Sequence, residues 1–186
     1  MRKFDLSSPL GRVLGSELPA GEVVDIVDER DVAIGTATIK DCLEMGLLHR
    51  AVAVLVLRTN GEFLLQQRSK SDRWQPGLWT LSSTGHVKAG EAYDDAAARE
   101  LSEELGISAG LVRLRKQLLP PIKSGGLTER EWVTLYVART DLPCRIDTAE
   151  VEAVKEVATP LLRRMFNDGS MTPDAVTLLT EYLENQ

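Results

Sequence analysis

Cysteine is scarce in this chain of 186 residues, because only Cys42 and Cys144 occur. Two cysteines are too few for a disulfide-stabilised scaffold. The N-terminus also lacks a signal-peptide pattern, and no apolar run is long enough to span a membrane. These absences argue against a secreted, disulfide-rich protein and against a membrane protein. They predict a cytoplasmic, reducing setting.

Basic residues are in the minority, with 22 Lys and Arg against 28 Asp and Glu and a net charge of −6. This charge argues against a role in coating nucleic acid or in binding an anionic membrane. We therefore expect a small molecule as the partner, with no nucleic acid and no membrane. The sequence leaves the oligomeric state open, a homodimer included.

A hydrophobic content of 43% can bury one sizeable core over this length, and nothing in the chain demands two domains. Residues 1–20 mix Ser, Pro and Gly with short apolar steps, which predicts an N-terminal extension without an assigned role. Residues 21–186 are expected to form a single domain.

Apolar periodicity and turn-forming residues predict the order of strands and helices. Asn60-Gly61 favours a type I′ turn between two of the strands. Strands are predicted at 23–28, 32–38, 49–58, 63–68, 80–83, 111–119, 132–139 and 150–159. Helices are predicted at 39–45, 92–105, 160–167 and 173–184.

The predicted helix at 92–105 carries three glutamates on one side. At about 100° per residue, Glu100, Glu103 and Glu104 share an arc of roughly 100°. The expected buried stripe lies beside this arc and consists of Ala97, Ala98, Leu101 and Leu105. An acidic patch beside a buried face favours Mg²⁺ or Mn²⁺, because these hard divalent cations prefer oxygen ligands. Taken alone, the three acids could also form a solvated face.

A wider pattern of fixed spacing includes these acids. Its order is G-x5-E-x7-R-E-L-x-E-E-x-G-I, and its members are Gly85, Glu91, Arg99, Glu100, Glu103, Glu104 and Gly106. This pattern resembles the signature box of the Nudix hydrolases at each position. The resemblance implies an α/β fold in which a mixed β-sheet lies between helices. It also implies the family's activity, cleavage of a nucleoside diphosphate linked to another group.

The same resemblance implies a role for each box residue. Glu100, Glu103 and Glu104 are expected to bind Mg²⁺ or Mn²⁺ with help from the carbonyl of Gly85. Arg99 is expected to orient the box carboxylates, and Glu100 is also a candidate general base. The bound metal would neutralise the diphosphate and activate a water molecule, so no nucleophilic Ser or Cys is required.

The polar loop 68–79 is expected to border this site. Arg68, Lys70 and Arg73 could grip phosphate, and Trp74 or Trp79 could stack on a ring. The alternative is a solvated loop whose tryptophans pack in the core.

A narrower resemblance, to the type I isopentenyl diphosphate isomerases, extends outside the box. The matching segments are 48–50, 64–69, 76–79, 85–86 and 129–131. This resemblance implies a second metal site made of His49, His86, Glu129 and Glu131, with Cys42 in place of a further histidine. Such a donor set suits Zn²⁺ or a similar transition metal.

Each of these residues also has an ordinary structural reading, as a satisfied histidine or a surface acid. If no second metal binds, Glu129 or Glu131 should face the box and could act as the general base.

One departure from the isomerases concerns catalysis. Where they carry a catalytic cysteine, immediately before the Gly-His pair, this chain has Thr84, whose hydroxyl is far too weak an acid. The sequence therefore favours a Mg²⁺-dependent hydrolase acting on a nucleoside di- or triphosphate or a related small molecule. An isopentenyl diphosphate isomerase is the alternative, and a non-catalytic ligand-sensing module is the second alternative.

Overall fold

The structure is a computed structural model that describes residues 21–72 and 74–185. The predicted N-terminal extension, residues 1–20, lies outside the described residues, and so does Arg73. The strands are β1 (Val23–Val27), β2 (Ala33–Thr38), β3 (His49–Leu57), β4 (Phe63–Arg68), β5 (Trp79–Thr80), β6 (Ser83–His86), β7 (Leu111–Leu118), β8 (Ile122–Ser124), β9 (Leu127–Glu129), β10 (Glu131–Arg139) and β11 (Val151–Val157). The helices are α1 (Ile39–Met45), α2 (Tyr93–Leu105), α3 (Thr159–Met165) and α4 (Pro173–Glu184). Within the described part of the chain, no helix has the length and apolar content needed to cross a membrane.

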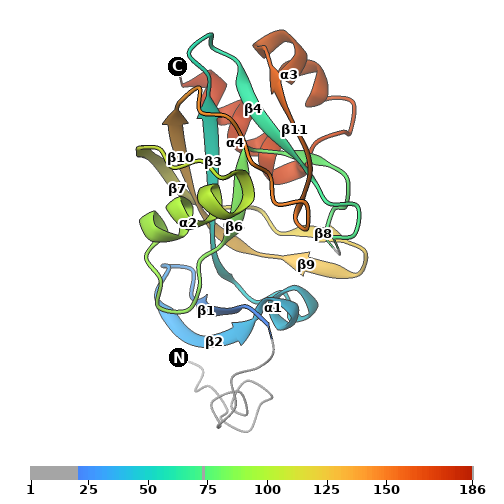
Figure 1. The fold of residues 1–186 in the computed structure, drawn as a ribbon. Helices are drawn as coiled ribbons and strands as arrows, with labels where there is room; N and C mark the ends of the chain where they lie inside the picture. The colour runs from blue at the N-terminus through green and yellow to red at the C-terminus, as the bar shows by residue number, and fades with distance from the viewer. Residues whose placement is uncertain (1–20, 73, 186) are drawn as a thin grey trace, which may run out of the picture.

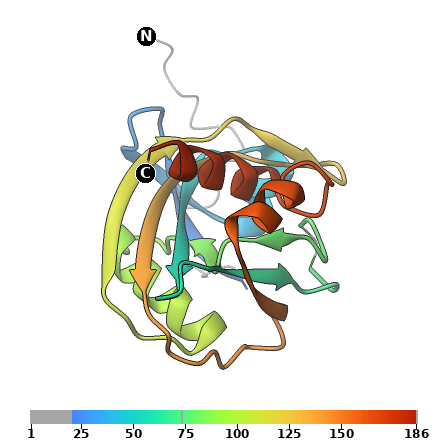
Figure 2. The ribbon, with the colours of Figure 1, turned by 90° about the horizontal axis from the view of Figure 1, so that it is seen from above.

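Strand β3 lies at the centre of the sheet because its side chains are buried on both faces. Odd positions from Ala51 to Leu57 pack in the core with α3 and α4, whereas even positions from Val52 to Val56 pack with α2. β10 runs parallel to β3 along its whole length, and β1, β4 and β6 pair with it antiparallel. Figures 1 and 2 show α2 on one face of this sheet and α3 and α4 on the other. The predicted α/β fold, a mixed sheet between helices, is therefore confirmed.

Helix α1 begins and ends where its sequence predicts. The hydroxyl of Thr38 accepts a hydrogen bond from the backbone N–H of Asp41 at 3.1 Å, which caps the start of the helix. Gly46 ends the helix in a left-handed conformation with φ of 63°. Strand β4 and helix α4 also have the predicted bounds.

The turn between β3 and β4 has a different type from the predicted one. Gly61 has a φ of 85°, but Asn60 does not adopt the positive φ that a type I′ turn requires. The backbone N–H of Gly61 donates to the carbonyl of Arg58, and the N–H of Arg58 donates to the carbonyl of Glu62. The side chain of Asn60 accepts from the N–H of Glu62 at 2.9 Å, which favours this three-residue loop with its glycine bulge.

The predicted strand at 80–83 is divided in two. β5 pairs with β4, whereas β6 pairs with β3, and the chain crosses between them at Ser82. The buried hydroxyl of Ser82 accepts from the N–H of Val56 at 2.7 Å and donates to the carbonyl of Leu64 at 2.6 Å. These side-chain bonds satisfy backbone groups where β3 and β4 separate. The crossing places Thr84, Gly85 and His86 beside the middle of β3.

The sequence patterns do not predict the hairpin of β8 and β9. Gly125 and Gly126 form its turn with φ of 56° and 82°, and two consecutive positive φ values are typical of a type I′ turn. The hairpin matters for function because it ends at Glu129, two residues before the start of β10.

The buried face of α2 is rotated relative to the prediction. Ala96 is fully buried and Ala98 is exposed, so Ala98 was wrongly assigned to the buried stripe. Because the stripe is shifted toward the acids, Glu100 and Glu104 lie within it and are themselves buried. Glu103 remains exposed at its edge, with a side chain 56% accessible.

Candidate active site

One cavity of about 510 Å³ is lined by residues from both groups of predicted site residues. The box contributes Gly85, Glu100, Glu103 and Glu104, which come from β6 and α2. On the other side, His86, Glu129 and Glu131 come from β6, β9 and β10. The fold therefore brings the two groups, which are far apart in sequence, to one cavity.

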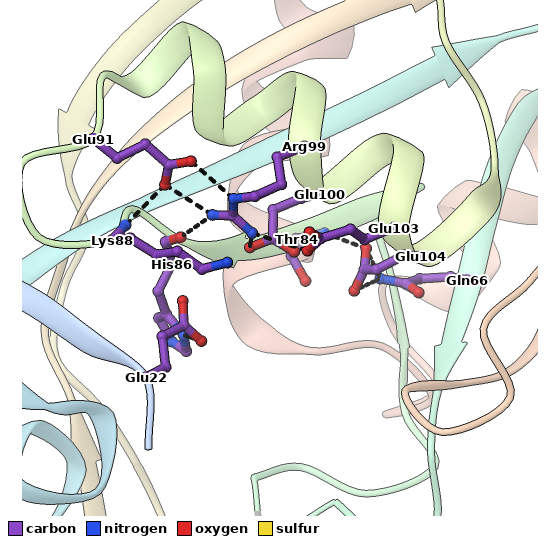
Figure 3. Close-up of polar contacts among 10 residues, drawn as sticks. All are labelled: Glu22, Gln66, Thr84, His86, Lys88, Glu91, Arg99, Glu100, Glu103 and Glu104. Carbon is purple, nitrogen blue, oxygen red and sulfur yellow. Dashed lines mark hydrogen bonds and ion pairs between the residues drawn. The ribbon is translucent and has the colours of Figure 1, made fainter. Parts of the chain in front are cut away.

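Arg99 connects the acids of the box. Its Nε and Nη2 atoms donate to the two carboxylate oxygens of Glu91, each at 2.8 Å. Its Nη1 atom donates to Glu100 at 2.6 Å and to Glu103 at 3.1 Å. Nη2 also donates to the carbonyl of His86 at 3.0 Å. Figure 3 shows Arg99 between Glu91 on one side and Glu100 and Glu103 on the other, so this guanidinium fixes the position of three carboxylates.

Glu104 is held by hydrogen bonds, and it forms no ion pair with any residue that the structure describes. Its oxygens accept from the side-chain amide of Gln66 at 3.2 and 3.3 Å and from the backbone N–H of Thr84 at 3.1 Å. Burial, together with the nearby charge of Glu100, raises the pKa of Glu104 to about 8. Burial also raises the pKa of Glu100. A bound cation would stabilise the charged form of both carboxylates.

Gly85 occupies a position where no side chain fits. A Cβ atom at this residue would overlap the carboxylate of Glu100. The glycine thus allows Glu100 to lie directly against β6, next to the Gly85 backbone. Three carboxylates and a nearby carbonyl are all oxygen donors, so these residues fit a hard divalent cation such as Mg²⁺ or Mn²⁺.

The second group consists of His49, His86, Glu129 and Glu131, whose ligand atoms all lie within 4.8 Å of one another. The Nδ1 atom of His49 lies 3.0 Å from the carbonyl of Leu47. Because a carbonyl can only accept, Nδ1 carries a proton in this contact, and Nε2 is the nitrogen that faces Glu131. Nε2 is buried without a hydrogen-bond partner and lies 3.5 Å from Glu131. An orphaned imidazole nitrogen facing a carboxylate is the arrangement that a metal ion would complete.

Charges within this second group influence one another strongly. Burial lowers the pKa of His49, but contacts with Cys42 and Glu131 outweigh burial and raise it above its ordinary value. For Glu131, burial raises the pKa, but the nearby imidazole of His49 brings it below its ordinary value. Burial and the neighbouring Glu131 raise the pKa of Glu129. Cys42 lies buried on α1 and is not one of the four residues whose ligand atoms converge.

The predicted substrate residues of the loop 68–79 separate in the structure. Arg68 and Trp74 line the cavity, and the Nε atom of Arg68 donates to the carbonyl of Trp74 at 3.0 Å. Lys70 does not line it, because its side chain is 72% exposed and its Nζ atom pairs with Glu152 at 3.0 Å. Trp79 also lies elsewhere, with the Nζ atom of Lys155 3.9 Å from its ring centre.

Sequence reasoning missed several polar residues of the cavity. Gln66 belongs to a segment that resembles the isomerases, and it is a polar residue buried in a strand. These two features are the signals that could have identified it as a site residue. Glu22 lies 3.9 Å from the Nδ1 atom of His86, and Asp174 is at the start of α4, where no sequence pattern marks them. Among the described residues, nine carboxylates line the cavity against three Lys or Arg side chains, so an anionic substrate requires bound cations. The acids are Glu22, Asp72, Glu100, Glu103, Glu104, Glu129, Glu131, Glu150 and Asp174, and the bases are Arg68, Lys88 and Arg99.

Known proteins resemble this chain in sequence and in structure. The NUDIX domain model matches residues 47–173. Isopentenyl-diphosphate Delta-isomerase 2 of Photorhabdus laumondii is 34% identical over 157 residues, which cover 84% of this chain and 87% of the relative. An uncharacterised Nudix hydrolase of Pseudomonas aeruginosa is 32% identical over 163 residues, which cover 88% and 94%. A Deinococcus radiodurans protein of known structure has a TM-score of 0.72 at 23% identity, covering 86% of this chain and 98% of that one.

A mixed sheet between helices, with an acidic helix at one cavity, defines a protein of the Nudix fold. The chain belongs to the NUDIX domain family, and the matched residues include the box and all four members of the second group. Isomerases and Nudix hydrolases both occur among its relatives, so the predicted resemblance to the isomerase-like subgroup is confirmed.

Proposed function

We propose that this protein is a Mg²⁺- or Mn²⁺-dependent hydrolase that cleaves a diphosphate linkage in a small molecule. The observation that carries this proposal is the complete box, in which Arg99 holds Glu100 and Glu103 at a cavity. Membership of the NUDIX domain family supports it. Nucleoside di- and triphosphates are the first substrates to test, and the cytoplasm is the proposed location because both cysteines are free.

In this proposal, Glu100, Glu103, Glu104 and the carbonyl of Gly85 hold the divalent cation. When bound, the cation neutralises the phosphate oxygens and lowers the pKa of a water molecule. Arg99 keeps the carboxylates in place, and Glu100 or Glu131 accepts the proton of the attacking water. Arg68 and Trp74, which line the same cavity, contact the substrate.

A substrate panel tests the proposal directly. Nucleoside di- and triphosphates, dinucleotides, sugar nucleotides and prenyl diphosphates are incubated with Mg²⁺, with Mn²⁺ or with EDTA, and the products are separated by chromatography. The proposal expects hydrolysis of at least one compound with metal and none with EDTA. Absence of hydrolysis across the panel would instead favour the ligand-sensing alternative.

Isomerisation of isopentenyl diphosphate is the second candidate function. The names of several relatives and the His49, His86, Glu129 and Glu131 group favour it. Thr84 counts against it, because this residue stands at the catalytic cysteine position of the isomerases and its hydroxyl is a poor acid. We expect no useful formation of dimethylallyl diphosphate, and robust formation of this product would make the isomerase the better assignment.

We further propose that the second group binds Zn²⁺ or a similar transition metal. The converging nitrogen and carboxylate atoms and the orphaned Nε2 atom of His49 support this site. With that metal bound, Glu131 acts as a ligand, and Glu100 remains the general base. Metal analysis of the protein purified without added zinc tests the proposal and does not depend on knowing the substrate.

A further inference from the structure

We propose that Arg50 is a positioning residue for the Nudix box, although it does not line the cavity. Arg50 follows His49 on β3, and its side chain extends to the ribbon of β1 and β2. The inference rests on the proposed function in one respect, namely that the box binds a divalent cation.

The guanidinium of Arg50 uses all three nitrogens in hydrogen bonds. Nε donates to the carboxylate of Asp31 at 2.6 Å, and Nη2 donates to the carbonyl of Asp31 at 2.8 Å. Nη1 donates to the Oδ2 atom of Asp25 at 3.1 Å. The strand pairing between β1 and β3 consists of Ile26 and His49, and the N–H of Val27 also donates to the carbonyl of Leu48 at 2.9 Å. The side-chain bonds of Arg50 add to this short backbone attachment of the ribbon.

Asp25 links Arg50 to the loop 87–91, which precedes α2. The same Oδ2 atom accepts a hydrogen bond from the backbone N–H of Gly90 at 3.2 Å. Two backbone bonds also hold the loop, from Val87 to the carbonyl of Arg50 and from Ala89 to the carbonyl of Val23. The loop is therefore fixed at three points, all of which lie on Arg50 or on the strand that Arg50 binds.

Glu91, directly after Gly90, accepts both hydrogen bonds from Arg99 described above. Its carboxylate also accepts from the N–H of Lys88 at 2.9 Å, so its orientation depends on the loop (Figure 3). Because Arg99 in turn holds Glu100 and Glu103, a displaced loop would alter the spacing of the metal ligands.

Asp31 provides a second connection from Arg50 to α2. It is a non-glycine residue with a φ of 61°, a conformation that requires support from its surroundings. Its carboxylate accepts from the hydroxyl of Tyr93, the first residue of α2, at 3.1 Å, and from Lys116 at 2.7 Å. The turn held by Arg50 therefore also fixes the start of the helix that bears the box acids.

Arg58, near the other end of β3, is a matched control for Arg50. It is 8% exposed, and its guanidinium donates to Glu156 at 2.7 Å and to the carbonyls of Thr140 and Leu142 at 3.0 and 2.8 Å. Its Nη2 atom also lies 3.5 Å from the sulfur of Cys144, and among the described residues none of these four partners hydrogen-bonds to Glu100, Glu103 or Glu104. Each of these sets of bonds requires the planar guanidinium with its several N–H donors, and lysine cannot reproduce it. Arg50→Lys and Arg58→Lys should therefore lose comparable stability.

The experiment measures Mn²⁺ binding by electron paramagnetic resonance in the wild-type protein, Arg50→Lys and Arg58→Lys. Glu103→Gln, measured in parallel, identifies the binding that belongs to the box. We expect the box affinity of Arg50→Lys to fall between about threefold and tenfold, below the range of about 10- to 100-fold typical of direct outer-shell partners. Arg58→Lys should bind Mn²⁺ like the wild type at a similar loss of melting temperature.

Equal Mn²⁺ affinity in the two lysine variants would overturn the positioning role while leaving the metal-binding box intact. By contrast, Mn²⁺ binding that Glu103→Gln leaves unchanged would contradict the proposed function itself. If Arg50→Lys does not fold, Asp25→Ala replaces it, because this change removes the acceptor that Arg50 and Gly90 share. An unchanged affinity in Asp25→Ala would likewise overturn the inference.

Discussion

The two candidate metal groups face one cavity but are built in opposite ways. Three box acids, Glu100, Glu103 and Glu104, belong to helix α2, and Gly85 precedes the start of that helix by eight residues. The second group draws its four residues from β3, β6, β9 and β10, which meet only in the folded sheet. The box offers oxygen alone, whereas the second group offers two imidazole nitrogens and two carboxylates.

This difference determines which cations each group can bind and whether each group can be recognised in the sequence. Oxygen donors select hard cations such as Mg²⁺, whereas imidazole favours Zn²⁺ and other transition metals. The helix also makes the box a local feature of the sequence, while the second group depends on long-range strand pairing. The predictions below test whether the two groups are separate in chemistry as well as in construction.

The largest effect is expected from Glu103→Gln and Glu104→Gln. Each change removes a negative ligand with little change in volume, so hydrolysis should fall by roughly a thousandfold, about 4 kcal/mol, while the fold survives. Rates on the best substrate of the panel, with circular dichroism as a check on folding, measure this. Asp95→Asn, an exposed acid on the same helix, is the control. Near-normal rates in both glutamine variants would refute the metal assignment.

Arg99→Ala should reduce hydrolysis by about a hundredfold, because Glu91, Glu100 and Glu103 would lose their common partner. The loss acts through displaced carboxylates, so higher Mg²⁺ should recover part of the rate. A Mg²⁺ titration of the initial rate at saturating substrate measures this recovery. An unaltered rate would remove Arg99 from the site.

The double variant His49→Ala/His86→Ala should lose the transition metal but reduce Mg²⁺-dependent hydrolysis by less than about tenfold, because the ligands of the box remain. Elemental analysis of protein purified without added zinc gives the metal content, and Glu103→Gln serves as the control that retains it. Equal metal content in the double variant and the wild type would rule out the second site. A rate loss as large as that of Glu104→Gln would show that the groups act as one centre.

The smallest effect is expected from Cys42→Ala. Cys42 is buried but lies outside the four converging residues, so the transition-metal content should not change. Loss of a small buried side chain should cost about 1 kcal/mol of stability. Metal analysis and thermal unfolding measure the two quantities. Loss of the transition metal from the Cys42→Ala variant would show that Cys42 is a metal ligand.

Much of the fold and of the box is readable from the sequence because local patterns specify them. Helix α1 is marked by its capping Thr38 and its terminal Gly46, and the box by the spacing along α2. Lys70 shows the limit, since a cation in a polar loop can point toward solvent as readily as toward a cavity. Glu22 and Asp174 were missed because tertiary packing alone places them at the site.

The second group was foreseen only through the resemblance to the isomerases. No periodicity within the chain relates His49 to Glu131, and their proximity depends on the parallel pairing of β3 with β10. The hairpin that delivers Glu129 was also not predicted, because its strands are too short for a clear alternating pattern.

The parallel register of β3 and β10 also determines when the second group can form during folding. Helix α2 can form from neighbouring residues, but pairing His49 with Glu131 closes a long loop, which is an entropically costly and slow step. A slip of one residue along β10 would turn Glu131 to the opposite face of the sheet. A metal ion held by His49 and Glu131 would therefore bind only chains with the correct pairing and would stabilise that register over its competitors.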